Sequence, residues 1–392
     1  MKRAGEKRKM PPRVLFANPW WHAELVNSTA HHAAEHGWHL DLQTCLSGQL
    51  PERWDGDGII TALGGDLAAL RRFLRRARCP AVSLNTNYPE IRIARVSQDD
   101  AVAGRMAAGH FLGRGFAFYA YYSHGSSVYT GGLRRAAFAE TLAAAGHATI
   151  PLLWEEEGRR WADTWLNRER WLRRRLPCLP KPLAVFATND QAAVEVIEAC
   201  MAEGIDVPGE VAVLGMLDMT LFRESTTVPL SSIRVDFDTI TRTACDLLAR
   251  MMAGEPPPDE PILFPPTGVV ARRSTDTLAA RTPEVAHAIR FLLDHYAEPI
   301  GVPDIARVAG LSKTVLYERF RADLGQSPGE ALIRIRVEKA RRMLREGAAK
   351  VEAVAQACGF GDRVNLHRHF TKHVGMTPAA YRREARKQEV AP

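Results

Sequence analysis

The sequence predicts a multidomain protein in which a two-lobed α/β domain is followed by an all-α domain with two helix-turn-helix motifs. Three observations support this prediction. The chain has 392 residues, which is too long for one ordinary domain. Residues 13–275 alternate short apolar runs with longer amphipathic segments, whereas the chain after about residue 277 shows only helical periodicity. We place a linker at 276–283 and the helical domain at 284–386.

Six apolar runs predict the strands of the first domain: Arg13–Ala17, Gly58–Thr61, Ala81–Leu84, Phe116–Tyr121, Leu183–Ala187 and Val211–Leu214. Helical patterns lie between them at 64–78, 99–113, 132–145, 190–204 and 237–253. Continuous apolar strands separated by helices are typical of parallel, doubly wound sheets. We therefore expect two α/β lobes whose ligand binds beyond the carboxyl ends of the strands.

Charge and cysteine content narrow the function classes. From Thr277 to the C-terminus there are 20 Lys and Arg against 13 Asp and Glu, so the whole net charge of +7 lies there. Such an excess is expected of a domain that faces a polyanion. The six cysteines form no C-x-x-C pair, which argues against a zinc finger and for a reducing compartment.

The chain carries no sign of membrane contact. No apolar stretch approaches the ~18–20 residues that span a bilayer. The basic N-terminus lacks the apolar run of a secretory signal. We expect a cytoplasmic, nucleoid-associated protein.

Two helix-turn-helix units are predicted at 302–322 and 351–373. In each, a short amphipathic helix, a turn with glycine (Gly310 or Gly359) and a second helix follow one another, with an offset of 49 residues. The second turn is one residue longer. Helix starts of the type Ser/Thr-Pro occur at Thr282, Ser327 and Thr377, where the hydroxyl is expected to cap the helix.

One long helix, from about Pro328 to Arg345, is predicted between the two units. At 1.5 Å per residue its ~18 residues span roughly 27 Å. With flanking packing, this length could place two recognition helices about one DNA turn, ~34 Å, apart. One chain would then occupy two adjacent major grooves of double-stranded DNA.

The helical domain resembles the AraC/XylS family of bacterial regulators. The resemblance covers 284–386 and is most specific in GFGDRVNLHRHFTKHVGMTPAAYRR (359–383), which keeps the family spacing G-F…F-x-x-x-x-G-x-T-P-x-x-Y-R. Gly361 stands where the family usually has Ser, and Asn365-Leu366 replace its usual Tyr-Phe pair. The resemblance implies a DNA-binding transcription regulator.

Helical geometry places the expected DNA-contacting side chains outward. Several positions match the base-reading sites of the family, where Arg can pair with guanine, Asn with adenine and Glu with cytosine. Lys313 and Lys372 are better suited to phosphates. The full set comprises Lys313, Thr314, Tyr317, Glu318 and Arg321 in the first unit, and Arg363, Asn365, His367, Arg368 and Lys372 in the second. A solvated helix face is the alternative for any one of them.

The first domain resembles the periplasmic-binding-protein-like sensor of LacI/GalR regulators over about 13–275. The resemblance rests on Asp99 with Gly104, Arg134 before Phe138, Asn189-Asp190 after a strand, and the exit IRVDFDTITRTACDLLARMMAGE followed by RRST. We expect no DNA-binding headpiece before residue 13. A sensor of this kind joined to an AraC-type C-terminus resembles the bacterial xylose-operon regulator group.

A sugar effector needs planar hydrogen-bonding groups and an aromatic plate. Candidates at strand ends are Trp20, Trp21, Arg134, Asn189, Asp190 and Asp218, although both tryptophans could equally be packing residues. The family usually has an acidic residue where this chain has Leu217, and often Gln at Val235. The resemblance therefore favours xylose or a related pentose without identifying the sugar.

Other functions are disfavoured by missing features. His32 and His36 lie i, i+4 on an expected helix, but a third ligand is not evident, so we expect no metal site. The sequence contains no catalytic constellation and no nucleotide-binding loop, so we expect neither enzyme activity nor a cofactor. The alternatives kept are a plain sugar-binding protein and an enzyme with an appended DNA module. We expect a homodimer that binds adjacent half-sites on DNA and contacts RNA polymerase.

Overall fold

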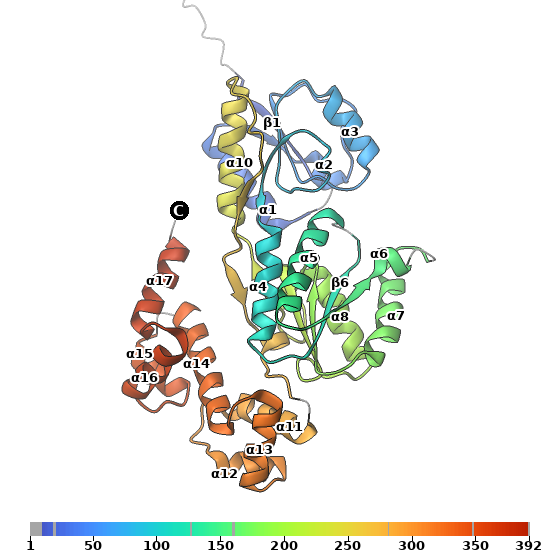
Figure 1. Ribbon diagram of the computed structural model, residues 1–392. Helices are drawn as coiled ribbons and strands as arrows, with labels where there is room; N and C mark the ends of the chain where they lie inside the picture. The colour runs from blue at the N-terminus through green and yellow to red at the C-terminus, as the bar shows by residue number, and fades with distance from the viewer. Residues whose placement is uncertain are drawn as a thin grey trace, which may run out of the picture.

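The computed structural model describes residues 10–18, 21–125, 128–158, 161–280, 282–346 and 349–390. Two α/β lobes are stacked on each other, and a helical domain lies against the second lobe (Figure 1). This arrangement confirms the predicted fold class. Within the described residues, no helix is long and apolar enough to cross a membrane.

Lobe 1 is built on a six-stranded parallel sheet in the order β11-β5-β4-β3-β1-β2. Helix α10 packs against α1 and against strands β3 to β5, and α2 contacts β1. The strands are β1 (Arg13–Ala17), β2 (His39–Asp41), β3 (Gly58–Thr61), β4 (Ala81–Ser83), β5 (Ala94–Gln98) and β11 (Ile262–Phe264). The helices are α1 (Ala23–Glu35), α2 (Gln43–Ser47), α3 (Leu67–Arg76) and α10 (Phe237–Met252).

Lobe 2 is a second six-stranded sheet in the order β12-β10-β9-β8-β6-β7, in which only the β10–β12 pair is antiparallel. Its strands are β6 (Phe118–Ser123), β7 (Thr149–Leu153), β8 (Leu183–Ala187), β9 (Val211–Leu217), β10 (Ser231–Arg234) and β12 (Gly268–Val270). Its helices are α4 (Asp100–Leu112), α5 (Val128–Ala144), α6 (Trp154–Glu157), α7 (Trp165–Arg175), α8 (Asp190–Ala202) and α9 (Thr220–Glu224), and short 3₁₀ turns occupy Leu176–Cys178 and Arg273–Thr275.

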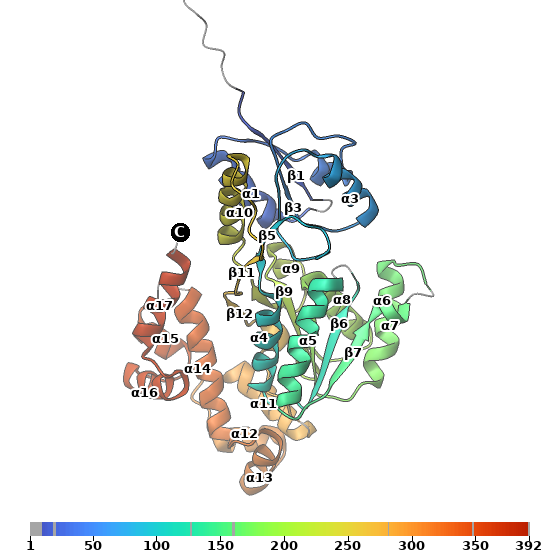
Figure 2. The same ribbon diagram turned by 45° about the horizontal axis from the view of Figure 1, so that its top comes forward.

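The chain crosses between the lobes three times: after β5, after β10 and between β11 and β12. These crossings form the hinge, and the carboxyl ends of the parallel strands of both lobes face the space between them (Figure 2). The fold therefore places any interlobe ligand next to residues that end strands.

Six strands were not predicted from the sequence, and three predicted strands end elsewhere. β2, β7, β11 and β12 are edge strands, which need only one buried side and so lack a continuous apolar run. β5 and β10 contain polar side chains that are nevertheless buried, among them Arg95, Ser97 and Ser232. The strand predicted at Phe116–Tyr121 lies at Phe118–Ser123, β4 ends one residue earlier than predicted, and β9 ends three residues later.

The helical domain contains α11 (Pro283–His295), α12 (Val302–Ala309), α13 (Lys313–Leu324), α14 (Pro328–Glu346), α15 (Val351–Ala357), α16 (Arg363–Val374) and α17 (Pro378–Val390). It has two hydrophobic cores. One surrounds Ile305 and Phe320, and the other surrounds Leu366 and Phe370. Helix α14 supplies side chains to both cores, so it joins the two units as predicted (Figure 1).

The turn geometry of both units follows the sequence prediction. Gly310 and Gly359 end the first helices at φ 66° and 74°, a region that favours glycine. From the glycine to the N-cap, the second turn has one extra residue, Gly361. The N-caps are Ser312 and Asp362, whose side chains accept a hydrogen bond from the backbone three residues on.

Two of the three predicted hydroxyl caps are present. Ser327 Oγ accepts from the Glu330 amide at 3.3 Å while the Glu330 carboxylate accepts from the Ser327 amide at 2.7 Å, which is a capping box. Thr377 Oγ1 accepts from a backbone amide at 3.2 Å. Thr282 precedes α11 but does not cap it, because its hydroxyl and amide both donate to Asp323.

Replacing Gly359 by alanine is expected to destabilise the helical domain more than the same change at Gly310. Both variants force a side chain into the left-handed region, which costs about 1 kcal/mol. Only at Gly359 would the new Cβ lie 2.4 Å from the Tyr296 carbonyl oxygen, whereas at Gly310 no atom lies within 4 Å. Such a backbone clash adds roughly 1–3 kcal/mol. Thermal unfolding should show the difference, and equal losses would contradict it.

Candidate functional site

Arg134 of α5 is a buried link between three elements of the sensor. Its Nε lies 2.6 Å from Asp100 Oδ1 at the start of α4, and its guanidinium also donates to the Thr188 carbonyl after β8. The side chain is only 5% exposed. Arg134 therefore fixes the carboxylate of Asp100 in place.

Asp190 lies at the start of α8 and is almost fully buried. Its carboxylate accepts hydrogen bonds from Ser232 Oγ at 2.5 Å and from the Met219 amide at 2.7 Å. Burial raises the pKa of Asp190 to about 7, and the nearby charge of Asp218 acts in the same direction. The two oxygens are thus engaged within lobe 2.

Asp218 is held by two arginines of the same lobe. Arg234 Nε lies 2.8 Å from one oxygen and Arg272 Nη2 lies 2.7 Å from the other. Its backbone and that of Leu217 have positive φ values of 53° and 105°. A non-glycine residue in this region is strained, and such strain occurs preferentially at functional sites.

The remaining predicted ligand residues occupy different environments. Asn189 caps α8 by accepting from the Ala192 amide at 2.8 Å. Trp21 precedes α1 and is 54% exposed. Trp20 lies outside the described residues. The structure thus brings Arg134, Asn189, Asp190 and Asp218 together at the strand ends of lobe 2, with Trp21 on lobe 1.

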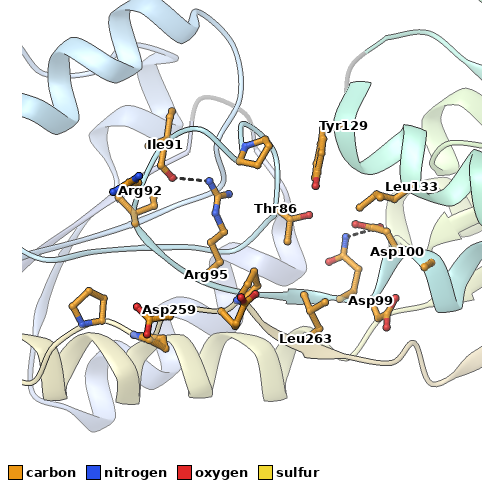
Figure 3. A pocket seen from close by; sticks show the side chains of 18 residues that line it. Thr86, Ile91, Arg92, Arg95, Asp99, Asp100, Tyr129, Leu133, Asp259 and Leu263 are labelled. Atoms are coloured by element: carbon orange, nitrogen blue, oxygen red, sulfur yellow. Dashed lines mark hydrogen bonds between the residues drawn. The ribbon is translucent and has the colours of Figure 1, made fainter.

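A cavity of about 840 Å³ opens beside the hinge, between the two lobes (Figure 3). Lobe 1 contributes Thr86 and Arg95, the hinge contributes Asp100, and Tyr129 and Leu133 face them from lobe 2. The segment 257–261 before β11 closes one side. Its size suits a small organic ligand, for which sites of ~300–1,000 Å³ are usual.

Two buried oxygens in the wall of this cavity lack a partner among the described residues: Thr86 Oγ1 and Asp100 Oδ2. Burial raises the pKa of Asp100, although Arg134 opposes the shift. Buried polar atoms without partners are rare and are natural contacts for ligand hydroxyls. The sequence prediction missed Asp100 because β5 was not recognised, so Asp100 was not known to follow a strand. It also missed Thr86, although the strand before that residue was predicted.

The first recognition helix, α13, presents all five of its predicted DNA-contacting residues to solvent. Leu316 and Phe320 on the opposite face are fully buried. Tyr317 is 39% exposed and Glu318 is also exposed, so both side chains are available to base edges. This geometry suits insertion of the helix into a major groove.

The second recognition helix, α16, exposes Arg363, His367, Arg368 and Lys372. Asn365 is half-buried, and its amide contacts Asp362 Oδ2 at 2.9 Å and an Arg368 nitrogen at 3.0 Å. These contacts orient Arg368 along the helix. They would have to open before Asn365 could pair with adenine.

The segment predicted as a polar linker is buried between the sensor and the helical domain. Leu278 packs into the core of the first helix-turn-helix unit, while Ala279 packs into the sensor core. The Ala279 amide also donates to the Arg114 carbonyl at 3.0 Å. Residues 278–280 (LAA) are apolar although their neighbours in sequence are polar, which explains why Leu278 and Ala279 are buried.

A buried polar cluster fixes this segment to lobe 2. Arg114 Nε donates to the Thr275 carbonyl at 2.8 Å, and one of its terminal nitrogens lies 3.1 Å from His110 Nδ1. Because arginine only donates, His110 Nδ1 is the acceptor and His110 Nε2–H donates to Thr275 Oγ1 at 2.9 Å. Burial, assisted by the Arg114 charge, lowers the pKa of His110 well below its usual value.

Ion pairs complete the junction. Arg290 of α11 lies 2.8 Å from Asp206 of lobe 2, and Lys339 of α14 pairs with Asp276. Arg345, near the end of α14, donates to the Val269 carbonyl of β12 at 3.4 Å and to Tyr381 Oη at 2.8 Å. The helix that joins the two units thus touches a strand next to the hinge.

Two protein families match separate parts of the chain. Residues 108–275 match the periplasmic binding protein-like domain, and residues 305–384 match a helix-turn-helix domain. These regions correspond to the α/β domain from within α4 to its end and to most of the helical domain. Both families agree with the folds described above.

Individual proteins match over different lengths. The xylose operon regulatory protein of Escherichia coli K12 is 25% identical over 396 residues, 96% of this chain and 97% of that protein. An AraC-like transcription regulator of Streptomyces antibioticus is 40% identical over 101 residues, 26% of this chain and 33% of that one. The solved structure of a xylose-binding transcription activator shares the fold, with a TM-score of 0.62, 22% identity and coverage of 95% and 98%.

Replacing His110 by glutamine is expected to weaken the dependence of stability on pH. The folded pKa of His110 is depressed, so the unfolded chain takes up the proton first as pH falls through about 6.5. Stability is then present above that pH and lost below it, by up to about 1.4 kcal/mol per pH unit. Urea unfolding should show a shallower loss in H110Q. The exposed His287→Gln variant should match the parent, and an unchanged slope in H110Q would contradict the assignment.

Proposed function

We propose that this homologue of the xylose operon regulators, with its LacI-like sensor and AraC-type DNA-binding domain, is a transcription activator controlled by a sugar bound between the sensor lobes. The observation that carries the proposal is the cavity at the hinge, which holds the unpartnered oxygens of Thr86 and Asp100. Sugar hydroxyls are the natural partners of such oxygens. The same chain carries two solvent-facing recognition helices.

The ligand residues are proposed in two groups. Thr86, Asp100 and Tyr129 would contact the sugar in the cavity. Arg134 would also act by holding the Asp100 carboxylate. The residues that keep the ligand-binding roles proposed from the sequence are Trp20, Trp21, Arg134, Asn189, Asp190 and Asp218. Opening of the ion pairs at Asp218 would free its carboxylate for a ligand.

The apolar positions Leu217 and Val235 bear on the choice of sugar. Val235 is 6% exposed and belongs to the main sensor core, against which Leu217 also packs. Neither side chain can donate or accept a hydrogen bond. Neither residue lines the hinge cavity, so we propose xylose and related pentoses first because of the relatives named above.

For regulation, we propose that sugar binding closes the lobes and moves the hinge strands. The contact of Arg345 with the Val269 carbonyl would carry this movement to α14 and so to the second recognition helix. A homodimer would then place its recognition helices on adjacent half-sites of double-stranded DNA and contact RNA polymerase. A monomer in gel filtration, with and without DNA, would contradict the dimer.

Replacing Thr86 by valine is expected to weaken sugar binding by about fivefold without lowering the stability of the free protein. The hydroxyl has no partner in the free chain, so only the ligand loses a hydrogen bond, which is worth about 1 kcal/mol. A thermal-shift titration with pentoses, hexoses and deoxyhexoses measures both effects.

Thr44→Val is the matched control for the Thr86 variant, because Thr44 Oγ1 is also buried without a partner among the described residues but lies on α2. It should bind the sugar like the parent. Equal affinity of T86V and the parent would contradict the proposed site. Turnover of any sugar would favour the alternative of an enzyme with an appended DNA module.

Replacing Arg368 by alanine is expected to weaken binding to the operator by roughly 10- to 100-fold, and binding to unrelated DNA much less. A bidentate contact to a base contributes about 1–3 kcal/mol of discrimination, whereas a phosphate contact contributes to every sequence alike. Fluorescence anisotropy at fixed salt measures both affinities. Arg307→Ala removes an exposed charge from α12 and should affect both DNAs equally. Equal losses for R368A would make Arg368 a phosphate contact.

A further inference from the structure

Three potential metal ligands meet at the C-terminal end of α1: His31, His32 and Glu35. One ligand atom from each lies within 4.8 Å of the other two. The Glu35 carboxylate is 2.8 Å from His32 Nδ1 and 3.6 Å from His31 Nε2. Ligand atoms bound tetrahedrally at about 2.0–2.1 Å are about 3.3 Å apart, so small side-chain adjustments suffice.

The second nitrogen of His32 provides independent support. His32 Nε2 lies 2.9 Å from Asp238 Oδ1 on α10, 206 residues away, and the His32 side chain is only 2% exposed. Histidines that bind metals usually donate their other N–H to a carboxylate, which fixes the ring. Asp238 is itself positioned by Arg242 at 2.9 Å and Ser28 at 3.3 Å.

We infer that His31, His32 and Glu35 form a binding site for a transition-metal ion of the Zn²⁺ type. His32 Nδ1, His31 Nε2 and one Glu35 oxygen supply two nitrogens and one oxygen. Such a set suits Zn²⁺ or Ni²⁺ and disfavours Mg²⁺ and Ca²⁺, which prefer oxygen alone. Three protein ligands leave at least one coordination position open to water.

This site differs from the pair that the sequence singled out. His36 Nε2 lies 2.9 Å from Asp246 Oδ1, and its ring stacks on Trp38 with 4.7 Å between centroids. It therefore belongs to a separate contact between α1 and α10. The metal site consists of His32 with His31 and Glu35, and His36 is not part of it.

The residues that line the hinge cavity do not come from α1, but α1 does reach the lobe interface. Near the start of α1, Glu24 accepts a hydrogen bond from the Thr220 amide of lobe 2 at 2.8 Å. A metal that stabilises the last turn of α1 therefore acts on a helix that contacts both lobes. The inference does not depend on which sugar the sensor binds.

The test uses the full-length chain without a histidine tag, stripped of metal with a chelator, and Zn²⁺ or Co²⁺ alone as the probe. We expect Zn²⁺ to raise the melting temperature and Mg²⁺ to leave it unchanged. Co²⁺ should give a visible absorption band that Zn²⁺ abolishes. His31→Gln and Glu35→Gln should each weaken Zn²⁺ binding at least tenfold.

Two further variants separate a metal site from a set of ordinary ion pairs. His36→Gln, at the C-cap of α1, is the matched control and should bind Zn²⁺ like the parent. Asp238→Asn keeps all three ligands but alters their support, and should weaken binding by about 10- to 100-fold. No Zn²⁺ shift in the parent, or a shift lost in H36Q and kept in H31Q, would overturn the inference.

Discussion

The buried exit segment from Ser274 to Ala279 is the constraint on which the two-domain arrangement depends. Ser274 Oγ donates to the Val213 carbonyl at 2.6 Å and accepts from the Ser231 amide at 2.8 Å beneath lobe 2. These bonds are shielded from water, so breaking one would leave a buried polar group unpaired. The next residues, Leu278 and Ala279, then enter two different cores. The helical domain is consequently held against lobe 2 and does not hang on a flexible tether.

Helix α14 contacts the sensor and also connects the two DNA-binding units. The two helix-turn-helix units have separate cores, and α14 is the element that belongs to both. Its contacts with the sensor run from Lys339, which pairs with Asp276, to Arg345, which touches β12. A rigid helix with both ends defined fixes the spacing of the recognition helices. A movement of the hinge strands would reach the recognition helices through these contacts, together with the exit segment and the Arg290–Asp206 pair.

Within the described part of the sensor, some buried polar groups have hydrogen-bond partners and others do not. At the strand ends of lobe 2, Asp190 and Asp218 are bonded by protein donors, so they stabilise the lobe before any ligand arrives. In the hinge cavity, by contrast, Thr86 and Asp100 keep oxygens without partners among the described residues. Unpaired buried oxygens destabilise the free protein. A ligand that pairs them would stabilise the sensor where its lobes meet.

The sequence by itself determined the features that depend on neighbours a few residues apart. The two turn glycines, the capping box at Ser327 and the outward face of α13 were all predicted, because helix periodicity and caps are local. The family resemblances were also recognisable from sequence alone, in residues 359–383 and in the sensor motifs.

Only the tertiary structure decided which distant residues meet. The pairing of His32 with Asp238, the burial of Leu278 in one core and Ala279 in another, and the partners of Asp218 each join segments far apart in the chain. β5 was missed because Arg95 and Ser97 look exposed in sequence but are buried, with Arg95 donating to backbone carbonyls of the 85–91 loop. Burial and long-range pairing depend on the whole fold, and a local pattern does not contain them.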